Sequence, residues 1–309
     1  MNPVGIDVSK DLLEVATGEG RSRIARNKQN LDELMASLPA DTVIAAEATG
    51  RYHRMVVQAA ADAGREIRLV DPHGFSHYRK SVHPRAKNDR LDAKALRRYA
   101  EKESDRLRPA KPSEPQLQRL KDLLELRETQ VKLRTAWRQS MSEFEKVPAA
   151  TKRALESMNK SIADLDKRIL EIGQRFELYE RLKQMDGVGE CLAPALVWLF
   201  TDKSFENDDQ PVAFTGMDVA VRQSGKFEGK RKLTKRGPAF IRRLLYCASN
   251  SLRRNAEFAD LFAKHHAKGL RTKGVNVAVG RKILRTAYHL ASNPELRYNR
   301  AKFLGGVLT

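Results

Sequence analysis

The chain has 309 residues, with 58 lysines and arginines against 39 aspartates and glutamates, and so a formal net charge of +19. This length predicts two or three domains, and so basic a chain indicates a polyanionic partner such as nucleic acid. The longest unbroken apolar run, residues 191–200, is about half the roughly 20 residues of a membrane-spanning helix. The first residues, MNPVGIDVSK, lack a signal-peptide pattern. We therefore expect a cytoplasmic protein with no membrane partner.

Residues 1–108 alternate short β-rich runs with helical segments. The expected strands are residues 4–8, 12–16, 22–25, 42–47 and 66–70. The expected helices are residues 31–38, 53–63 and 90–103. A ribonuclease H-like α/β domain has this order of elements: three strands, then helix, strand, helix, strand and helix. We predict a domain of this RuvC-like class, with an antiparallel meander of three strands and later strands joined by crossovers.

Residues 109–180 are predicted to be a linker followed by coiled-coil helices. Pro109, Pro112 and Pro115 interrupt any helix at the start of this segment. Apolar residues then recur three and four positions apart from Leu155 to Tyr179, which is the heptad pattern of a coiled coil. The partner of this stripe is either residues 117–144, folded back as a hairpin, or the same segment of a second subunit. The third predicted domain, residues 181–309, is basic and mostly helical.

Four acidic residues of the first domain occupy positions that would converge in such a fold. Asp7 interrupts an apolar strand, Glu47 ends the fourth strand, and Asp89 and Asp92 lie three apart at the start of a helix. Clustered carboxylates repel one another unless cations neutralise them. We predict a Mg²⁺ site, with two ions about 3.5–4 Å apart that stabilise the attacking and leaving oxygens of a phosphoryl transfer. A purely structural explanation is also open. Asp89 and Asp92 would then be acids favoured by the dipole at a helix N-terminus, and Glu47 would be an ordinary surface residue.

The segment from residue 222 to residue 243 carries nine basic residues and one acid, with three interspersed glycines. It is predicted to bind nucleic-acid phosphates, although such a run is also typical of a solvated face. The predicted contacts are Arg222, Lys226, Lys230, Arg231, Lys232, Lys235 and Arg236. Ser224 places a hydroxyl among these cations, where an alkoxide and a phosphodiester would both be stabilised. By itself, a serine before a glycine is more often a turn residue.

A second phosphate contact is predicted in the sequence MDGVGE, which precedes the apolar run at residues 191–200. This pattern resembles a helix-hairpin-helix turn, in which Gly187 and Gly189 would present backbone N–H groups to a phosphate. A simple turn between two helices explains the same residues equally well.

Five motifs, in chain order, resemble the insertion sequence 110 family of transposases, which includes the Piv DNA invertases. They are GIDVSK, AAEATGRYH, KNDRLDAKAL, MDGVGECLAPAL and the block from GMDVAVRQSG to KRGPAFIRRLLY. The resemblance implies a RuvC-like domain whose metal ligands are Asp7, Glu47, Asp89 and Asp92, a coiled-coil connection, and a C-terminal domain whose nucleophile is Ser224. It also implies donor and target DNA, a noncoding bridge RNA that pairs with both, and homodimers that assemble into tetramers.

The predicted function is a Mg²⁺-dependent DNA recombinase that moves an insertion sequence through a covalent DNA–phosphoserine intermediate. One alternative is a RuvC-like endonuclease that uses metal-activated water, with Ser224 as scaffold. A second is a non-catalytic nucleic-acid-binding protein. The motif GIDVSKDLLEV also resembles the first phosphate hairpin of actin-like ATPases and sugar kinases, but the chain has no good second glycine-rich loop and a small-molecule kinase does not explain the charge.

Overall fold

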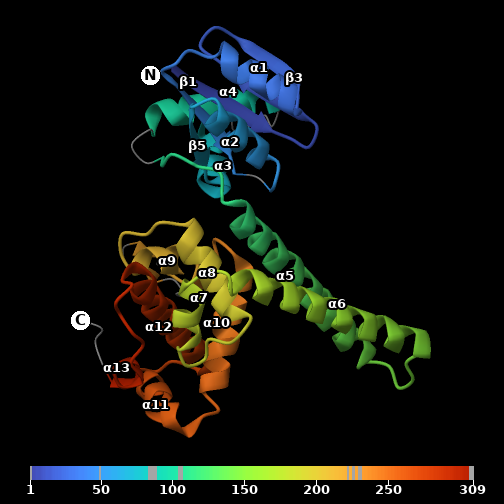
Figure 1. The fold of residues 1–309 in the computed structure, drawn as a ribbon, viewed down its shortest axis with the longest axis vertical. Coiled ribbons are helices and arrows are strands. Elements are labelled where there is room, and N and C mark those ends of the chain that lie inside the picture. Colours follow the sequence, from blue (N-terminus) through green and yellow to red (C-terminus); the bar gives the residue numbers. More distant parts are fainter. Residues whose placement is uncertain are drawn as a thin grey trace. The chain divides into compact units, whose positions relative to one another are not determined.

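The computed structural model describes residues 2–48, 50–82, 89–103, 107–220, 223–224, 227–228 and 232–305. The chain divides into two compact units, Met1–Ser113 and Glu114–Thr309 (Figure 1). The division into three domains, with boundaries after residues 108 and 180, stays a prediction. No helix among the described residues has the length and apolar character needed to cross a membrane.

The N-terminal unit is built on a five-stranded sheet with the order β3-β2-β1-β4-β5. Strand β1 pairs antiparallel with β2, which pairs antiparallel with β3, whereas β4 runs parallel to both β1 and β5. This is the arrangement that the sequence predicted for a ribonuclease H-like domain. The strands are β1 (Asn2–Val8), β2 (Leu12–Ala16), β3 (Arg21–Ala25), β4 (Thr42–Glu47) and β5 (Glu66–Val70).

Helices cover both faces of this sheet (Figure 1). Helices α1 (Lys28–Ser37) and α2 (His53–Asp62) bury one core against alternate residues of the strands, among them Ile6 and Ile44. Helices α3 (Pro72–Val82) and α4 (Asp89–Lys102) pack on the opposite face. The sequence did not predict α3, because this helix buries a single large apolar residue, Phe75, and so has no periodic apolar stripe.

The C-terminal unit begins with a helical hairpin formed by α5 (Pro115–Met141) and α6 (Ala149–Gly173) (Figure 1). The helices that follow are α7 (Leu178–Lys183), α8 (Leu192–Asp202), α9 (Asp209–Phe214), α10 (Ala239–Leu252), α11 (Ala259–Ala267), α12 (Thr272–Ser292) and α13 (Arg300–Gly305). Between α9 and α10 lie the two-residue strands β6 (Val219–Ala220), β7 (Gln223–Ser224), β8 (Phe227–Glu228) and β9 (Lys232–Leu233).

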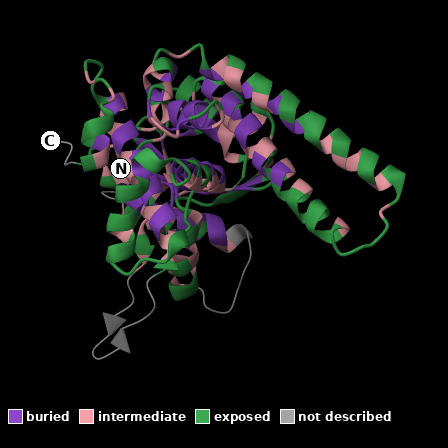
Figure 2. Cartoon of the chain, turned by 90° about the horizontal axis from the view of Figure 1, so that it is seen from below, coloured by how far each residue is buried: buried purple, intermediate pink, exposed green. Residues whose placement is uncertain are grey.

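The partner of the heptad stripe lies in the same chain. Leu165 and Ile169 of α6 are buried in one core with Leu120 and Leu124 of α5 and with the apolar helix α8. Burial is greatest where the hairpin joins this core and decreases toward its far end (Figure 2). Of the two partners left open by the sequence, the structure therefore shows the hairpin, and self-association of the protein stays a prediction.

A charge placed inside this core should strongly destabilise the C-terminal unit. Leu165 is 6% exposed, and a glutamate there would be an uncompensated buried charge, which costs about 3–5 kcal/mol. We expect Leu165→Glu to lower the midpoint of urea unfolding strongly. Ala163→Glu, at an exposed position of the same helix, should change the free energy of unfolding by less than about 0.5 kcal/mol. Equal stability of the two variants would contradict the hairpin packing.

Candidate active site and nucleic-acid interface

Three of the four predicted acidic ligands line one pocket of about 540 Å³ in the N-terminal unit: Asp7, Glu47 and Asp92. Gly5 of β1 lies beside Ala45 of β4 in the parallel register, so Asp7 and Glu47, each two residues further on, project from the same sheet face. Asp92 lies in the first turn of α4, which packs on that face. The sheet and one helix thus bring together carboxylates that are up to 85 positions apart in the chain.

Asp92 has an unusual environment for a carboxylate. It is only 6% exposed. Its Oδ2 accepts a hydrogen bond from Nη1 of Arg79 at 2.8 Å, whereas its Oδ1 is buried and has no hydrogen-bond partner among the described residues. A buried acceptor without a donor costs about 1–3 kcal/mol or more, so this oxygen is suited to a ligand. Oxygen donors of this kind are those that Mg²⁺ prefers.

The fourth predicted ligand, Asp89, begins α4, but its side chain lies outside the described residues. Among the side chains that the structure does describe, no group of three His, Cys, Asp or Glu residues is close enough to hold a metal ion. Asp7 and Glu47 do have interactions within the chain. The donor chemistry of the pocket therefore fits a divalent cation, and the complete ligand set stays a prediction.

Sequence reasoning missed Arg79, which lies on α3 and lines the same pocket with Lys10 and Tyr52. The guanidinium of Arg79 pairs with Asp92 and so offsets part of the negative charge gathered there. No local pattern marks Arg79, because its importance depends on a contact 13 residues away between two helices.

The close approach of α4 to the sheet depends on Gly5. A Cβ at this position would lie 2.1 Å from the carbonyl oxygen of Ala93 and 2.5 Å from the backbone nitrogen of Arg97. Both are backbone atoms of α4, so any side chain at residue 5 must push this helix away from β1. Because Asp92 directly precedes Ala93, such a shift would also move Asp92 away from Asp7.

We expect Gly5→Ala to impair metal binding in this pocket although it removes no ligand. Displacing α4 also strains the core, at a cost of about 1–3 kcal/mol. The measurement is Mn²⁺ affinity together with the urea midpoint. Gly20→Ala is the matched control, since a Cβ there meets nothing within 4 Å. Unchanged Mn²⁺ affinity in a folded Gly5→Ala protein would show that the position of α4 does not govern the site.

The basic segment is described in part. Lys232 starts β9, which pairs with β6, and Lys232, Lys235 and Arg236 are exposed. Arg222, Lys226, Lys230 and Arg231 lie outside the described residues.

The base of this segment packs tightly. A Cβ on Gly216 would lie 2.2 Å from the carbonyl oxygen of Arg236, and one on Gly237 would lie 1.9 Å from that of Phe214. These contacts hold the turn at residues 235–237 against the end of α9, so the exposed side chains of Lys235 and Arg236 project from a backbone that is held in place.

Ser224 ends strand β7, where the backbone pairs with Phe227 of β8. Its side chain lies outside the described residues. The structure therefore places the proposed nucleophile in the C-terminal unit, whereas Asp7, Glu47 and Asp92 belong to the N-terminal unit.

The glycine turn before α8 has a clear structural role. Gly187 has a φ of +80°, and a Cβ there would meet the side chain of Leu252 at 3.0–3.3 Å. Asp186 accepts hydrogen bonds from the hydroxyl of Tyr298 at 2.8 Å and from Arg300. The pKa of Tyr298 is raised, mainly by burial and secondly by its hydrogen bond to the carboxylate of Asp186. Gly189 is exposed, and phosphate binding at Gly187 and Gly189 stays a prediction.

Comparison with known families identifies the chain. Residues 4–144 match the family of DEDD transposases of the IS110 group, which is described as transposase. The transposase IS116/IS110/IS902 family matches residues 179–263. The chain belongs to the IS110 family of transposases, as its motifs indicated. It is therefore a DNA-processing recombinase, and the kinase alternative is not supported.

The pilin gene-inverting proteins of Moraxella bovis and Moraxella lacunata are each 25% identical to this chain over 310 residues, covering 92% of the chain and 94% of the relative. Thermus thermophilus RuvC gives a TM-score of 0.27 at 13% identity, covering 36% of this chain and all of RuvC. Thermus thermophilus RuvC in complex with a Holliday junction substrate gives a TM-score of 0.28 at 11% identity, covering 36% of this chain and 99% of that RuvC chain.

Proposed function

We propose that this transposase moves an insertion sequence by Mg²⁺-dependent attack of Ser224 on a DNA phosphate, followed by strand exchange. The observation that carries the metal-dependent part is the acidic pocket, in which Asp7, Glu47 and Asp92 line one cavity and Oδ1 of Asp92 lacks a partner among the described residues. Bound divalent ions would neutralise these carboxylates and stabilise negative charge on the scissile phosphate. Asp89, at the start of the same helix, is the proposed fourth ligand.

The chain's own groups have distinct roles in this proposal. Oγ of Ser224 forms a bond to phosphorus and loses its proton, while the bond from phosphorus to the 3′ oxygen breaks and that oxygen takes up a proton. A 3′ hydroxyl of the other duplex then attacks the phosphoserine and restores the serine. The phosphodiester is conserved throughout, so the reaction requires no ATP. Arg79 holds Oδ2 of Asp92 and so orients this carboxylate.

The proposed nucleic-acid partners are donor DNA, target DNA and the bridge RNA that the family resemblance implies. The exposed cations Lys232, Lys235 and Arg236, together with the basic residues of the undescribed stretches, would bind phosphates and release counterions. Ser224 and the acidic pocket lie in different units, so the proposal requires them to meet within one chain or between subunits. A homodimer that assembles into a tetramer is the proposed form.

The test is a strand-transfer reaction on DNA that carries the ends of the element, resolved under denaturing conditions. We expect a protein–DNA adduct that forms in Mg²⁺ and is absent in excess EDTA. Adduct formation at the wild-type rate in EDTA would contradict the metal-dependent mechanism. Cleavage in Mg²⁺ without any adduct would instead favour the endonuclease that uses water.

A further inference from the structure

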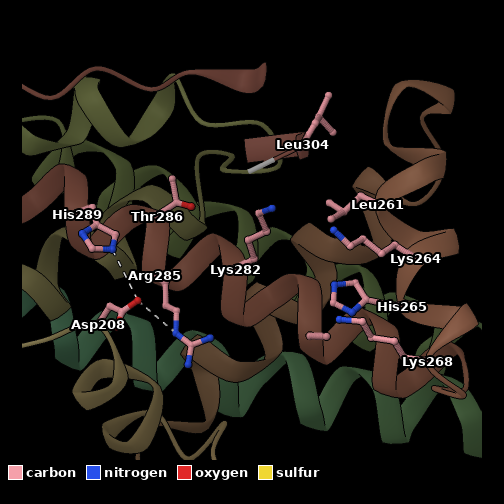
Figure 3. A pocket seen from close by; sticks show the side chains of 12 residues that line it. Asp208, Leu261, Lys264, His265, Lys268, Lys282, Arg285, Thr286, His289 and Leu304 are labelled. Atoms are coloured by element: carbon pink, nitrogen blue, oxygen red, sulfur yellow. Dashed lines mark ion pairs between the residues drawn. The ribbon is translucent and has the colours of Figure 1, made fainter. Parts of the chain in front are cut away.

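The C-terminal unit contains a second polar cavity, of about 480 Å³, that shares no residue with the acidic pocket or with residues 222–243 (Figure 3). It is lined by residues of α11, α12 and α13, by Lys268, which directly follows α11, and by Asp208, which precedes α9. Six lining side chains are basic: Lys264, His265, Lys268, Lys282, Arg285 and His289. We call it the lysine cavity.

The charges of the lysine cavity are balanced at one end only. There, Asp208 pairs with Arg285 at 3.4 Å and with His289 at 3.7 Å, as Figure 3 shows. At the other end, no carboxylate in the part of the chain that the structure describes pairs with Lys264, Lys268 or Lys282. Nζ of Lys282 lies 5.2 Å from the ring centroid of Phe303 instead. This end of the cavity therefore has an excess of positive charge.

The pKa values of two of these side chains, His265 and Lys282, are lowered, first by burial and then by neighbouring lysines. Burial lowers the pKa of His265, and Lys268, Lys282 and Lys264 lower it further. The pKa of Lys282 is also lowered, first by burial and then by Lys264. These groups repel one another across the cavity, and a bound anion would relieve that repulsion.

Thr286 provides an independent indication of a ligand. It lines the lysine cavity, is only 4% exposed, and its Oγ1 has no hydrogen-bond partner among the described residues. A buried hydroxyl without a partner is uncommon in folded proteins. A threonine hydroxyl donates readily to a phosphate oxygen. Leu261 and Leu304 also line the cavity and supply apolar surface there.

We propose that the lysine cavity binds one phosphate of a single nucleic-acid strand, with the adjoining nucleotide against Leu261 and Leu304. The proposal rests on the proposed function only in taking nucleic acid as the ligand, and it adds a contact outside residues 222–243. A cavity of this volume is typical of sites that enclose a small ligand. Duplex phosphates lie on a convex surface, whereas an unpaired nucleotide can enter a cavity.

The first experiment measures binding of a short single-stranded oligonucleotide, its duplex and inorganic phosphate to the full chain in EDTA. For Lys264→Gln/Lys268→Gln we expect about tenfold or greater loss of single-strand affinity. The salt dependence should also weaken, with the magnitude of the log–log slope reduced by about 0.7, because one phosphate of the strand is no longer neutralised. Duplex affinity should fall clearly less. The matched control is Lys160→Gln/Lys167→Gln, which removes the same charge from exposed positions of α6.

Thr286→Val separates a binding role from a structural one. The substitution replaces an unpartnered buried hydroxyl by a methyl group of similar size. If Thr286 serves a ligand, the free protein should keep its melting temperature or gain about 2–4 °C, and single-strand affinity should fall severalfold. A lower melting temperature with unchanged affinity would assign Thr286 a structural role and count against the proposal.

Two further results would overturn the proposal. Equal loss of single-strand affinity in the lysine variant and its control would show an effect of net charge alone. Phosphate binding that depends on the lysines, without any effect on strands, would assign the cavity to free phosphate. Because these measurements need neither metal nor cleavage, they can succeed even if Ser224 and the acidic pocket do not perform the proposed reaction.

Discussion

Asp92→Asn is expected to abolish DNA cleavage while leaving DNA affinity within about twofold of wild type. The substitution keeps the size of the side chain but removes the charge, so Oδ1 would no longer attract a divalent cation strongly. Transition-state stabilisation by a bound metal amounts to several kcal/mol, and we expect the cleavage rate to fall at least about a hundredfold. DNA affinity should persist because no basic contact is lost.

The contact between Asp92 and Arg79 makes a stability control necessary. Asparagine leaves the guanidinium of Arg79 without its ion-pair partner, so part of the effect on cleavage could arise from local unfolding. Urea unfolding and Mn²⁺ affinity should therefore be measured together. Asp32→Asn is the matched control, since Asp32 is exposed on α1. Wild-type Mn²⁺ affinity in Asp92→Asn would show that Asp92 is not a metal ligand.

Ser224→Ala should eliminate both strand transfer and the covalent protein–DNA species. If the serine is the nucleophile, no other group of the chain forms the phosphodiester bond, and the loss should be about a thousandfold or greater. Trapping on nicked or phosphorothiolate DNA, resolved under denaturing conditions, measures the adduct directly. Ser251→Ala, at an exposed position of α10, is the matched control. Cleavage by Ser224→Ala at the normal rate would identify a water-using endonuclease in which this serine is structural.

A mixing experiment shows whether the reacting groups come from one chain or two. Asp7→Asn and Ser224→Ala proteins should each be inactive alone. If the serine of one subunit acts at the acidic pocket of another, their mixture should recover part of the wild-type activity. Absence of recovery in mixtures that form mixed oligomers would place both groups in the same chain.

Much of this protein could be predicted from its sequence because the relevant signals are local. The alternation of apolar residues in short runs predicted all five strands of the sheet, with ends within two residues of those observed. Asp7 and Glu47 were recognisable as candidates because a charge in or at the end of an apolar strand is costly without a partner. The motif order indicated the family that the comparisons show.

Other features were decided by contacts between distant residues, and only the tertiary structure shows them. A heptad stripe indicates that one face of a helix must be buried, but it does not indicate which segment covers that face. The structure shows that Leu165 and Ile169 belong to a core within the same chain. The role of Arg79 depends on the packing of α3 beside α4, and that of Gly5 depends on how closely α4 approaches the sheet. In the same way, the lysine cavity combines cations from α11 and α12. Local sequence determines which surfaces must be buried, whereas tertiary packing determines which surfaces meet.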